Sequence, residues 1–187
     1  MLSILCLKWG DKYGPEYVNR IYNQCKEFIK LDFKFYCATD NSTKINPNIK
    51  ILDLNDYAIP IGKYGGQRLG KVFTAEKIKL IADERFYGTK VLLLDLDLLI
   101  HQDLKYFKQL DMSKPYIVRG WWNDIKKCRS NFGKIHSTPL NSSVIRWNRG
   151  QLKPIYDHIE NNKEYIFFSY RTIDNYLAHF FYDIWNE

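Results

Sequence analysis

The segment from Val91 to Ile100 places two acidic residues inside an otherwise apolar run. Such a run predicts a buried strand, and its length and composition favour the central strand of a parallel sheet. Side chains two residues apart on a strand project to the same side, so Asp95 and Asp97 are expected to point together. Two like charges on a buried face are costly unless a cation compensates them. A divalent ion with oxygen ligands, Mn²⁺ or Mg²⁺, would do so.

An alternative interpretation ends this strand at Leu94 and uses both aspartates to cap the following turn. An isolated Asp-x-Asp favours that alternative. Here the residues on both sides, 92–94 and 98–100, are apolar, which favours the buried strand and the metal site.

Length and composition indicate a folded protein with one core. The chain has 187 residues, 45% of them hydrophobic, so we expect residues 1–187 to form a single domain. The net charge of +7 favours an anionic partner such as a phosphorylated small molecule. The basic residues are scattered, so no nucleic-acid partner is expected.

Neither a signal peptide nor a membrane span is predicted, and the cysteine spacing is typical of reduced thiols. We therefore expect the protein in the cytoplasm, or in the host cytoplasm if it is viral. No apolar segment reaches the length of a membrane span, and residues 1–7 are too short and lack the basic leader of a signal peptide. The four cysteines contain no Cys-x-x-Cys pair, so reduced thiols and no zinc site are expected.

Apolar spacing predicts strands alternating with helices along the chain. The opening β-α-β pattern implies a parallel pair with a right-handed crossover, and no repeat or linker interrupts the chain. The predicted strands cover residues 2–7, 33–39, 49–54, 91–100, 116–120 and 140–147, and the predicted helices cover 18–29, 73–85, 103–110, 153–161 and 173–182.

Polar and aromatic residues follow the first two predicted strands. Ligands of open α/β sheets bind at the carboxyl ends of strands, where Asp40 could accept a hydrogen bond from a base or ribose. Trp9 and Tyr13 could stack on a base or a sugar ring. The alternatives are that Asp40 caps a turn and that the two rings cover the core.

Two further segments have weaker signals. The residues 65–71 have the Gly-x4-Gly-Lys spacing of a P-loop, but Val72 replaces the Ser or Thr that would hold Mg²⁺. The remaining possibilities are a basic loop that closes over an anion, with Lys63, Arg68 and Lys71, or a plain solvated loop. Thr172 is a plausible helix N-cap, with an acidic residue in the first turn after it.

Taken together and in this order, these segments resemble nucleotide-sugar-dependent glycosyltransferases of the GT-A fold. The likeness is to family-8-like enzymes, including small phage and bacterial ones. It runs through nearly the whole chain and rests on residues 5–13, 38–40, 75–80, 91–97, 141–144 and 174–175. It implies a single-domain, Rossmann-like α/β fold with a mostly parallel central sheet flanked by helices.

The resemblance implies an activity and a set of site residues. The activity is metal-dependent transfer of a sugar, with retention, from a UDP-sugar to a saccharide or other hydroxyl acceptor. Asp95 and Asp97 would bind Mn²⁺ or Mg²⁺, and Lys77 and Asp174 would be catalytic. The implied nucleotide-binding residues are Leu7, Lys8, Trp9, Tyr13, Asp40, Lys77, Asp95 and Leu96, and the implied substrate-binding residues are Asn141, Ser142, Ser143, Asp174 and Asn175.

The chain departs from the family pattern at three places. Ser143 replaces a glycine, and Asn175 replaces a glutamine after Asp174. The family commonly has a further C-terminal histidine that binds the metal, which no residue up to Glu187 supplies, so the third metal ligand stays open.

Two other functions remain possible on the sequence. A metal-dependent nucleotidyltransferase also uses paired aspartates, although no Gly-Ser precedes Asp95 at a helix start. A non-catalytic nucleotide- or sugar-binding protein could keep the same fold. An inverting glycosyltransferase would need a carboxylate base, which Asp174 could supply, so the stereochemistry also stays open.

Overall fold

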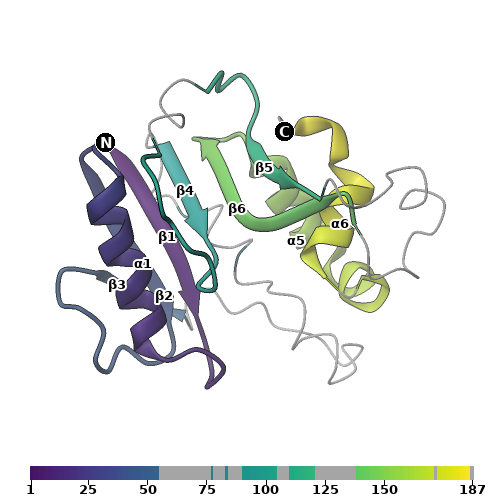
Figure 1. Ribbon diagram of the computed structural model, residues 1–187. Helices are drawn as coiled ribbons and strands as arrows, with labels where there is room; N and C mark the ends of the chain where they lie inside the picture. The colour runs from purple at the N-terminus through teal and green to yellow at the C-terminus, as the bar shows by residue number, and fades with distance from the viewer. Residues whose placement is uncertain are drawn as a thin grey trace.

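The computed structural model describes residues 1–54, 77, 83, 90–104, 110–120, 138–170 and 172–185. Its centre is a six-stranded mixed sheet with the strand order β3-β2-β1-β4-β6-β5 (Figure 1). The strands are β1 (Leu2–Lys8), β2 (Phe33–Thr39), β3 (Lys50–Asp53), β4 (Lys90–Leu94), β5 (Tyr116–Arg119) and β6 (Leu140–Asn148).

Four neighbouring strands are parallel, and two antiparallel strands complete the sheet. β1 pairs in parallel with β2 and with β4, and β2 pairs in parallel with β3. β6 pairs antiparallel with β4 and with β5, with an irregularity between Ile117 and Val118. This arrangement confirms the predicted mostly parallel sheet, and it brings the carboxyl ends of β1, β2 and β4 to one edge.

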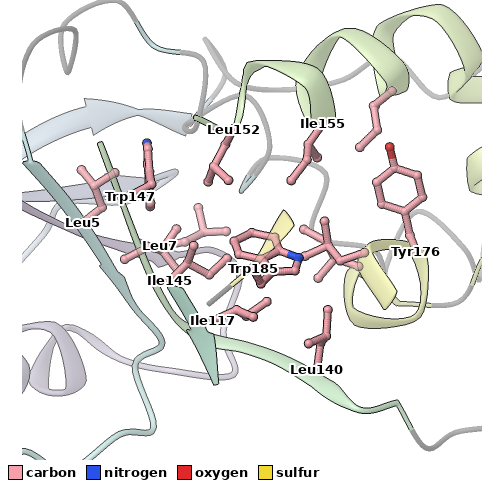
Figure 2. Packing of buried hydrophobic residues seen from close by; sticks show 14 of the residues in the cluster. Leu5, Leu7, Ile117, Leu140, Ile145, Trp147, Leu152, Ile155, Tyr176 and Trp185 are labelled. Carbon is pink, nitrogen blue, oxygen red and sulfur yellow. The ribbon is translucent and has the colours of Figure 1, made fainter. Parts of the chain in front are cut away.

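Helices cover both faces of the sheet: α1 lies against one face, and α5 and α6 lie on the other side (Figure 1). Alternation along β1 explains this, since Ile4 and Cys6 belong to the cluster beneath α1, whereas Leu5 and Leu7 belong to the other cluster. Figure 2 shows the second cluster. The helices are α1 (Pro15–Phe28), α5 (Lys153–Ser169) and α6 (Ile173–Phe180), followed by the 3₁₀ turn η3 (Tyr182–Ile184).

The helix boundaries differ from the predicted ones. α1 begins at Pro15, because proline has no amide hydrogen to lose in the first turn and its fixed φ suits that position. α5 continues past the predicted end to Ser169, with a non-helical residue, Asn162, at a kink. α6 ends at Phe180, two residues before the predicted end.

The predicted strand over residues 91–100 is wrong beyond Leu94. The chain turns after β4, with the amide of Leu98 lying 3.5 Å from the carbonyl oxygen of Asp95. Leu96 and Ile100 reach the core from this irregular segment, whereas Leu99 is 67% exposed. An apolar run alone does not distinguish a strand from a turn whose side chains point inward.

Some predicted features lie outside the described residues. These are the glycine-rich loop over 58–70, all of the 73–85 helix except Lys77 and Asp83, the middle of the 103–110 helix, and Cys128. Lys77 is helical, as predicted. Cys6, Cys25 and Cys37 are buried free thiols. None of the helices in the described part of the chain combines the length and the apolar character that a membrane span needs.

Candidate functional site

A pocket of about 300 Å³ opens at the carboxyl edge of β1 and β4. It is formed by the segment after β1, by the turn after β4 and by Lys77. Its lining comprises Leu7, Trp9, Gly10, Asp11, Lys12, Tyr13, Lys77, Asp95, Leu96 and Asp97. The structure therefore brings together both predicted metal ligands and most of the predicted nucleotide-binding residues.

Three lining residues were not predicted. Gly10, Asp11 and Lys12 lie between Trp9 and Tyr13 in the sequence, so membership of the same loop was the available signal. Lys12 places its ammonium group 4.6 Å from the centre of the Tyr13 ring, a cation–π arrangement.

Lys77 forms the buried ion pair of the site. Its Nζ lies 2.5 Å from Oδ1 of Asp95, and its side chain is 7% exposed. The same nitrogen donates to the carbonyl oxygen of Ser142 at 3.4 Å. Burial raises the pKa of Asp95, the nearby Lys77 opposes that shift, and the charges of Asp97 and Asp174 raise the pKa further. Among the described residues, the carboxylates of Asp95, Asp97 and Asp174 therefore act on one another beside Lys77.

Asp97 is held by an aromatic side chain from the other side of the pocket. The hydroxyl of Tyr13 donates to Oδ2 of Asp97 at 3.0 Å. The Tyr13 ring packs against Tyr17 with a centroid separation of 4.8 Å. Hydrogen bonding and ring packing thus fix Tyr13 across the pocket from the turn after β4.

Asp40 does not line this pocket and instead anchors the loop that does. Its Oδ2 accepts a hydrogen bond from the amide of Gly10 at 2.8 Å, and Nζ of Lys8 lies 3.8 Å from its Oδ1. Gly10 has φ +60°, in the left-handed region that glycine adopts without strain. Asp40 therefore positions the loop that carries Trp9 and Tyr13.

The polar start of β6 supports the site through its backbone. The amide of Asp95 donates to the carbonyl oxygen of Ser143 at 2.9 Å. The Asn141 side chain accepts from the Ser143 amide at 2.9 Å, and Ser142 is 5% exposed. These three residues lie behind the Lys77–Asp95 pair and are not among those that line the pocket.

The first turn of α6 packs against the same strand. Oδ1 of Asp174 accepts from the amide of Ser142 at 2.9 Å, so the strand and the helix are joined at this point. Burial raises the pKa of Asp174, while the hydrogen bonds from Ser142 and the charge of Lys77 oppose the shift. Thr172 accepts from the amide of Asn175 at 3.2 Å, which confirms the predicted N-cap.

The acidic side chains of the pocket suit a divalent cation in part. Asp95 and Asp97 supply oxygen donors on one wall, which Mg²⁺ and Mn²⁺ prefer. Burial raises the pKa of Asp95, and the charge of Asp97 adds to that shift. Across the described ranges, no group of three or more His, Cys, Asp or Glu side chains could hold a metal. A cation here would have two protein carboxylates and would need further oxygens from a ligand or water.

Comparison with known proteins identifies the fold. No protein-family model matches the chain, and no curated protein sequence matches it. Among solved structures, galactosyltransferase LgtC with donor and acceptor sugar analogs aligns over 87% of this chain, with a TM-score of 0.51 and 15% identity. Mouse xyloside xylosyltransferase 1 aligns over 94% (TM-score 0.53, 12% identity), and the glycosyltransferase GlyE of Streptococcus pneumoniae over 89% (TM-score 0.50, 17% identity).

The chain therefore has the fold of GT-A glycosyltransferases, as the sequence predicted. It is shorter than these proteins. It spans 65% of LgtC, 79% of the mouse enzyme and 40% of GlyE.

Proposed function

We propose that this chain is a metal-dependent glycosyltransferase that moves a sugar from a UDP-sugar to a hydroxyl acceptor, within a single domain of residues 1–187. The observation that carries the proposal is the pocket at the carboxyl edge of the sheet. There a buried lysine, the carboxylates of Asp95 and Asp97 and the aromatic side chains of Trp9 and Tyr13 converge from separate parts of the chain. Its place in a GT-A fold supports sugar transfer over other uses of paired aspartates.

The charges of the site suit a leaving diphosphate. When the bond between a sugar and a diphosphate breaks, negative charge develops on the phosphate oxygen. The ammonium group of Lys77 is already oriented by Asp95, so little reorganisation is needed to stabilise that charge. A Mn²⁺ or Mg²⁺ ion held by Asp95 and Asp97 would add electrostatic stabilisation of the same charge.

The aromatic side chains suit the nucleoside. Trp9 is 44% exposed although it lines the pocket, so its ring is available to a ligand. Tyr13 is fixed on the same side, and the backbone of Leu7 and Lys8 lies at the end of β1. The side chain of Asp40 is 44% exposed, and we assign it a hydrogen bond to the base, which we take to be uracil.

The sugar and acceptor are assigned to the start of β6 and the first turn of α6, which are joined to each other and do not line the pocket. Asn141, Ser142, Ser143, Asp174 and Asn175 remain the proposed substrate-binding residues. The carboxylate of Asp174 accepts a hydrogen bond from the backbone of β6. This contact favours a role for Asp174, among the proposed catalytic residues, in positioning the site over a role as a general base. A retaining transfer, which needs no protein base at the acceptor, agrees with this arrangement.

Thermal-shift measurements with UDP, GDP and CMP, each with and without Mn²⁺, test the donor class. We expect stabilisation by UDP only with the metal, and loss of that effect in Asp95→Asn and Asp97→Asn. Asp111→Asn is the matched control, because Asp111 also lies in an exposed turn but does not line the pocket. Equal UDP stabilisation in Asp97→Asn and in the wild type would contradict the site assignment.

A product assay with the full chain separates the competing functions. Release of UDP from a UDP-sugar supports the transferase. Release of pyrophosphate from a nucleoside triphosphate and a sugar phosphate supports a nucleotidyltransferase. Metal-dependent UDP binding without any turnover across a panel of acceptors supports a non-catalytic binding protein.

A further inference from the structure

A second and larger pocket lies at the opposite edge of the sheet. It has a volume of about 560 Å³, within the range typical of small-molecule sites. The starts of β1 and β4, the segment between α1 and β2, and the end of β6 form it, with the lining residues Met1, Leu2, Leu31, Asp32, Lys90, Leu92 and Arg146. Lys90 and Asp95 are the first residue of β4 and the residue after it, so the two pockets are roughly 15 Å apart along the strand.

Arg146 lies at the bottom of this pocket and is 2% exposed. It pairs with Leu92 across β4 and β6, so both side chains are on the same face of the sheet. Its Nη1 donates to the carbonyl oxygens of Val91, at 3.4 Å, and of Trp147, and to Oδ1 of Asn148 at 3.3 Å. All three acceptors are uncharged.

The positive charge of Arg146 has no compensating carboxylate in the part of the chain that the structure describes. No described atom accepts from its Nη2 or Nε, and no described acid pairs with it. Burial lowers its pKa to about 10, so the group is still charged at neutral pH. A buried guanidinium that keeps its charge and opens onto a cavity favours an anion from outside the chain.

The remaining lining defines the chemistry of that anion. Among the described lining residues, Lys90 is exposed and adds a second cationic side chain, while Asp32 has the one acidic side chain. Leu2, Leu31 and Leu92 make the rest of the wall apolar. We propose that this pocket binds a small amphiphilic anion, whose carboxylate or phosphate head lies against Arg146 and Lys90 and whose apolar part lies on the leucines.

Calorimetric titration of the full chain with four probes tests this site. Octanoate and octyl phosphate carry both features, inorganic phosphate carries only the head, and 1-octanol carries only the apolar part. We expect the two amphiphiles to bind. Octanol should bind at least about tenfold more weakly because it lacks the charge-assisted hydrogen bond, and inorganic phosphate should bind at least about tenfold more weakly because it lacks the apolar contact. The stronger of the two amphiphiles identifies the head group.

Variants assign the binding to the two cations. We expect Arg146→Gln to weaken octanoate and octyl phosphate binding about tenfold, and Lys90→Gln to weaken it about threefold, as for a partly solvated charge. Lys50→Gln is the matched control, because Lys50 is also the exposed first residue of a strand but does not line the pocket. We expect it to leave the affinities unchanged.

Several results would overturn the proposal. These are no binding of either amphiphile, equal binding of octanol and octanoate, or equal affinity in Lys90→Gln and Lys50→Gln. If Arg146→Gln does not fold, the Lys90→Gln comparison and the octanol comparison decide. Loss of UDP binding is not expected in Lys90→Gln, so failure of this site and failure of the proposed transferase activity are separable.

Discussion

The ammonium nitrogen of Lys77 lies 2.5 Å from Oδ1 of Asp95, with the lysine side chain almost fully buried. Burial raises the pKa of Asp95, this ion pair opposes the shift, and the charges of Asp97 and Asp174 raise the pKa further. Lys77 therefore stabilises the pocket, and under the proposed function it would present a cation to the phosphate of the donor.

Lys77→Met should destabilise the fold by about 1–3 kcal/mol, because it leaves a largely buried carboxylate without its partner. Urea unfolding measures this change, and the double variant with Asp95→Asn should recover part of it. Lys153→Met is the control, since Lys153 also lies 2.5 Å from a carboxylate, that of Asp157, but is 68% exposed. It should cost less than about 1 kcal/mol. A similar loss in both variants would mean that burial of the Lys77 pair has no energetic role.

Tyr13→Phe should weaken UDP binding about threefold to tenfold in Mn²⁺ and have less effect without the metal. The variant keeps the ring but loses the hydroxyl that donates to Asp97 at 3.0 Å, a hydrogen bond to a charged group. Calorimetry under both conditions measures the difference. Tyr17→Phe is the control, because Tyr17 packs against Tyr13 but does not line the pocket. A loss of equal size with and without Mn²⁺ would contradict a role through Asp97.

Gly10→Ala should lower both stability and UDP affinity. Gly10 has φ +60° and Gly150 has φ +78°, and a Cβ at either position meets nothing within 4 Å, so alanine adds backbone strain without a clash. Each substitution should cost about 1 kcal/mol in unfolding experiments. Only Gly10→Ala should weaken UDP binding, because Gly10 carries the contact to Asp40. Unchanged affinity in Gly10→Ala would show that this loop geometry does not matter for the ligand.

The stability of the protein should depend on pH through Asp174. Burial raises the pKa of its carboxyl above the ordinary 3.8, so the folded state binds more protons than the unfolded state between those two values. The contribution of Asp174 to stability is therefore greatest at low pH. It falls as the pH rises through that window, by at most about 1.4 kcal/mol per pH unit.

Comparison with Asp174→Asn isolates this effect, because asparagine keeps the acceptor for the amide of Ser142 and does not titrate. The difference in unfolding free energy between wild type and variant should shift against the wild type as the pH rises above 3.8. A difference that is flat with pH, or that moves the other way, would contradict the raised pKa.

Local patterns in the sequence were sufficient to predict the positions of most strands of the sheet. The strand over residues 33–39 was predicted with the bounds that the structure gives, and the first strand differs by one residue. Apolar alternation and the β-α-β order carry this information, because they reflect burial and chirality that do not depend on distant contacts. That residues 1–187 form one domain stays a prediction.

The candidate site was predicted in part. The residues of the Trp9–Tyr13 loop and the Asp95–Asp97 turn do meet in one pocket, since both follow parallel strands that end at the same edge. Other predicted residues do not line the pocket. Asp40 accepts a hydrogen bond from the Gly10 amide, and the carbonyl oxygen of Ser143 accepts one from the amide of Asp95. Those contacts depend on the direction of single side chains after the strand ends, which periodicity does not specify.

Sequence patterns were enough to predict the layered α/β architecture, the order along the chain of the strands and helices that the structure describes, and the carboxyl edge at which polar residues gather. The end of β4 at Leu94, which places Asp95 and Asp97 in one turn, and the ion pair between Lys77 and Asp95 became evident from the three-dimensional structure. The reason is physical. Burial and pairing of a charge depend on which distant groups lie within a few ångströms, and the same apolar run can bury its residues from a strand or from a turn.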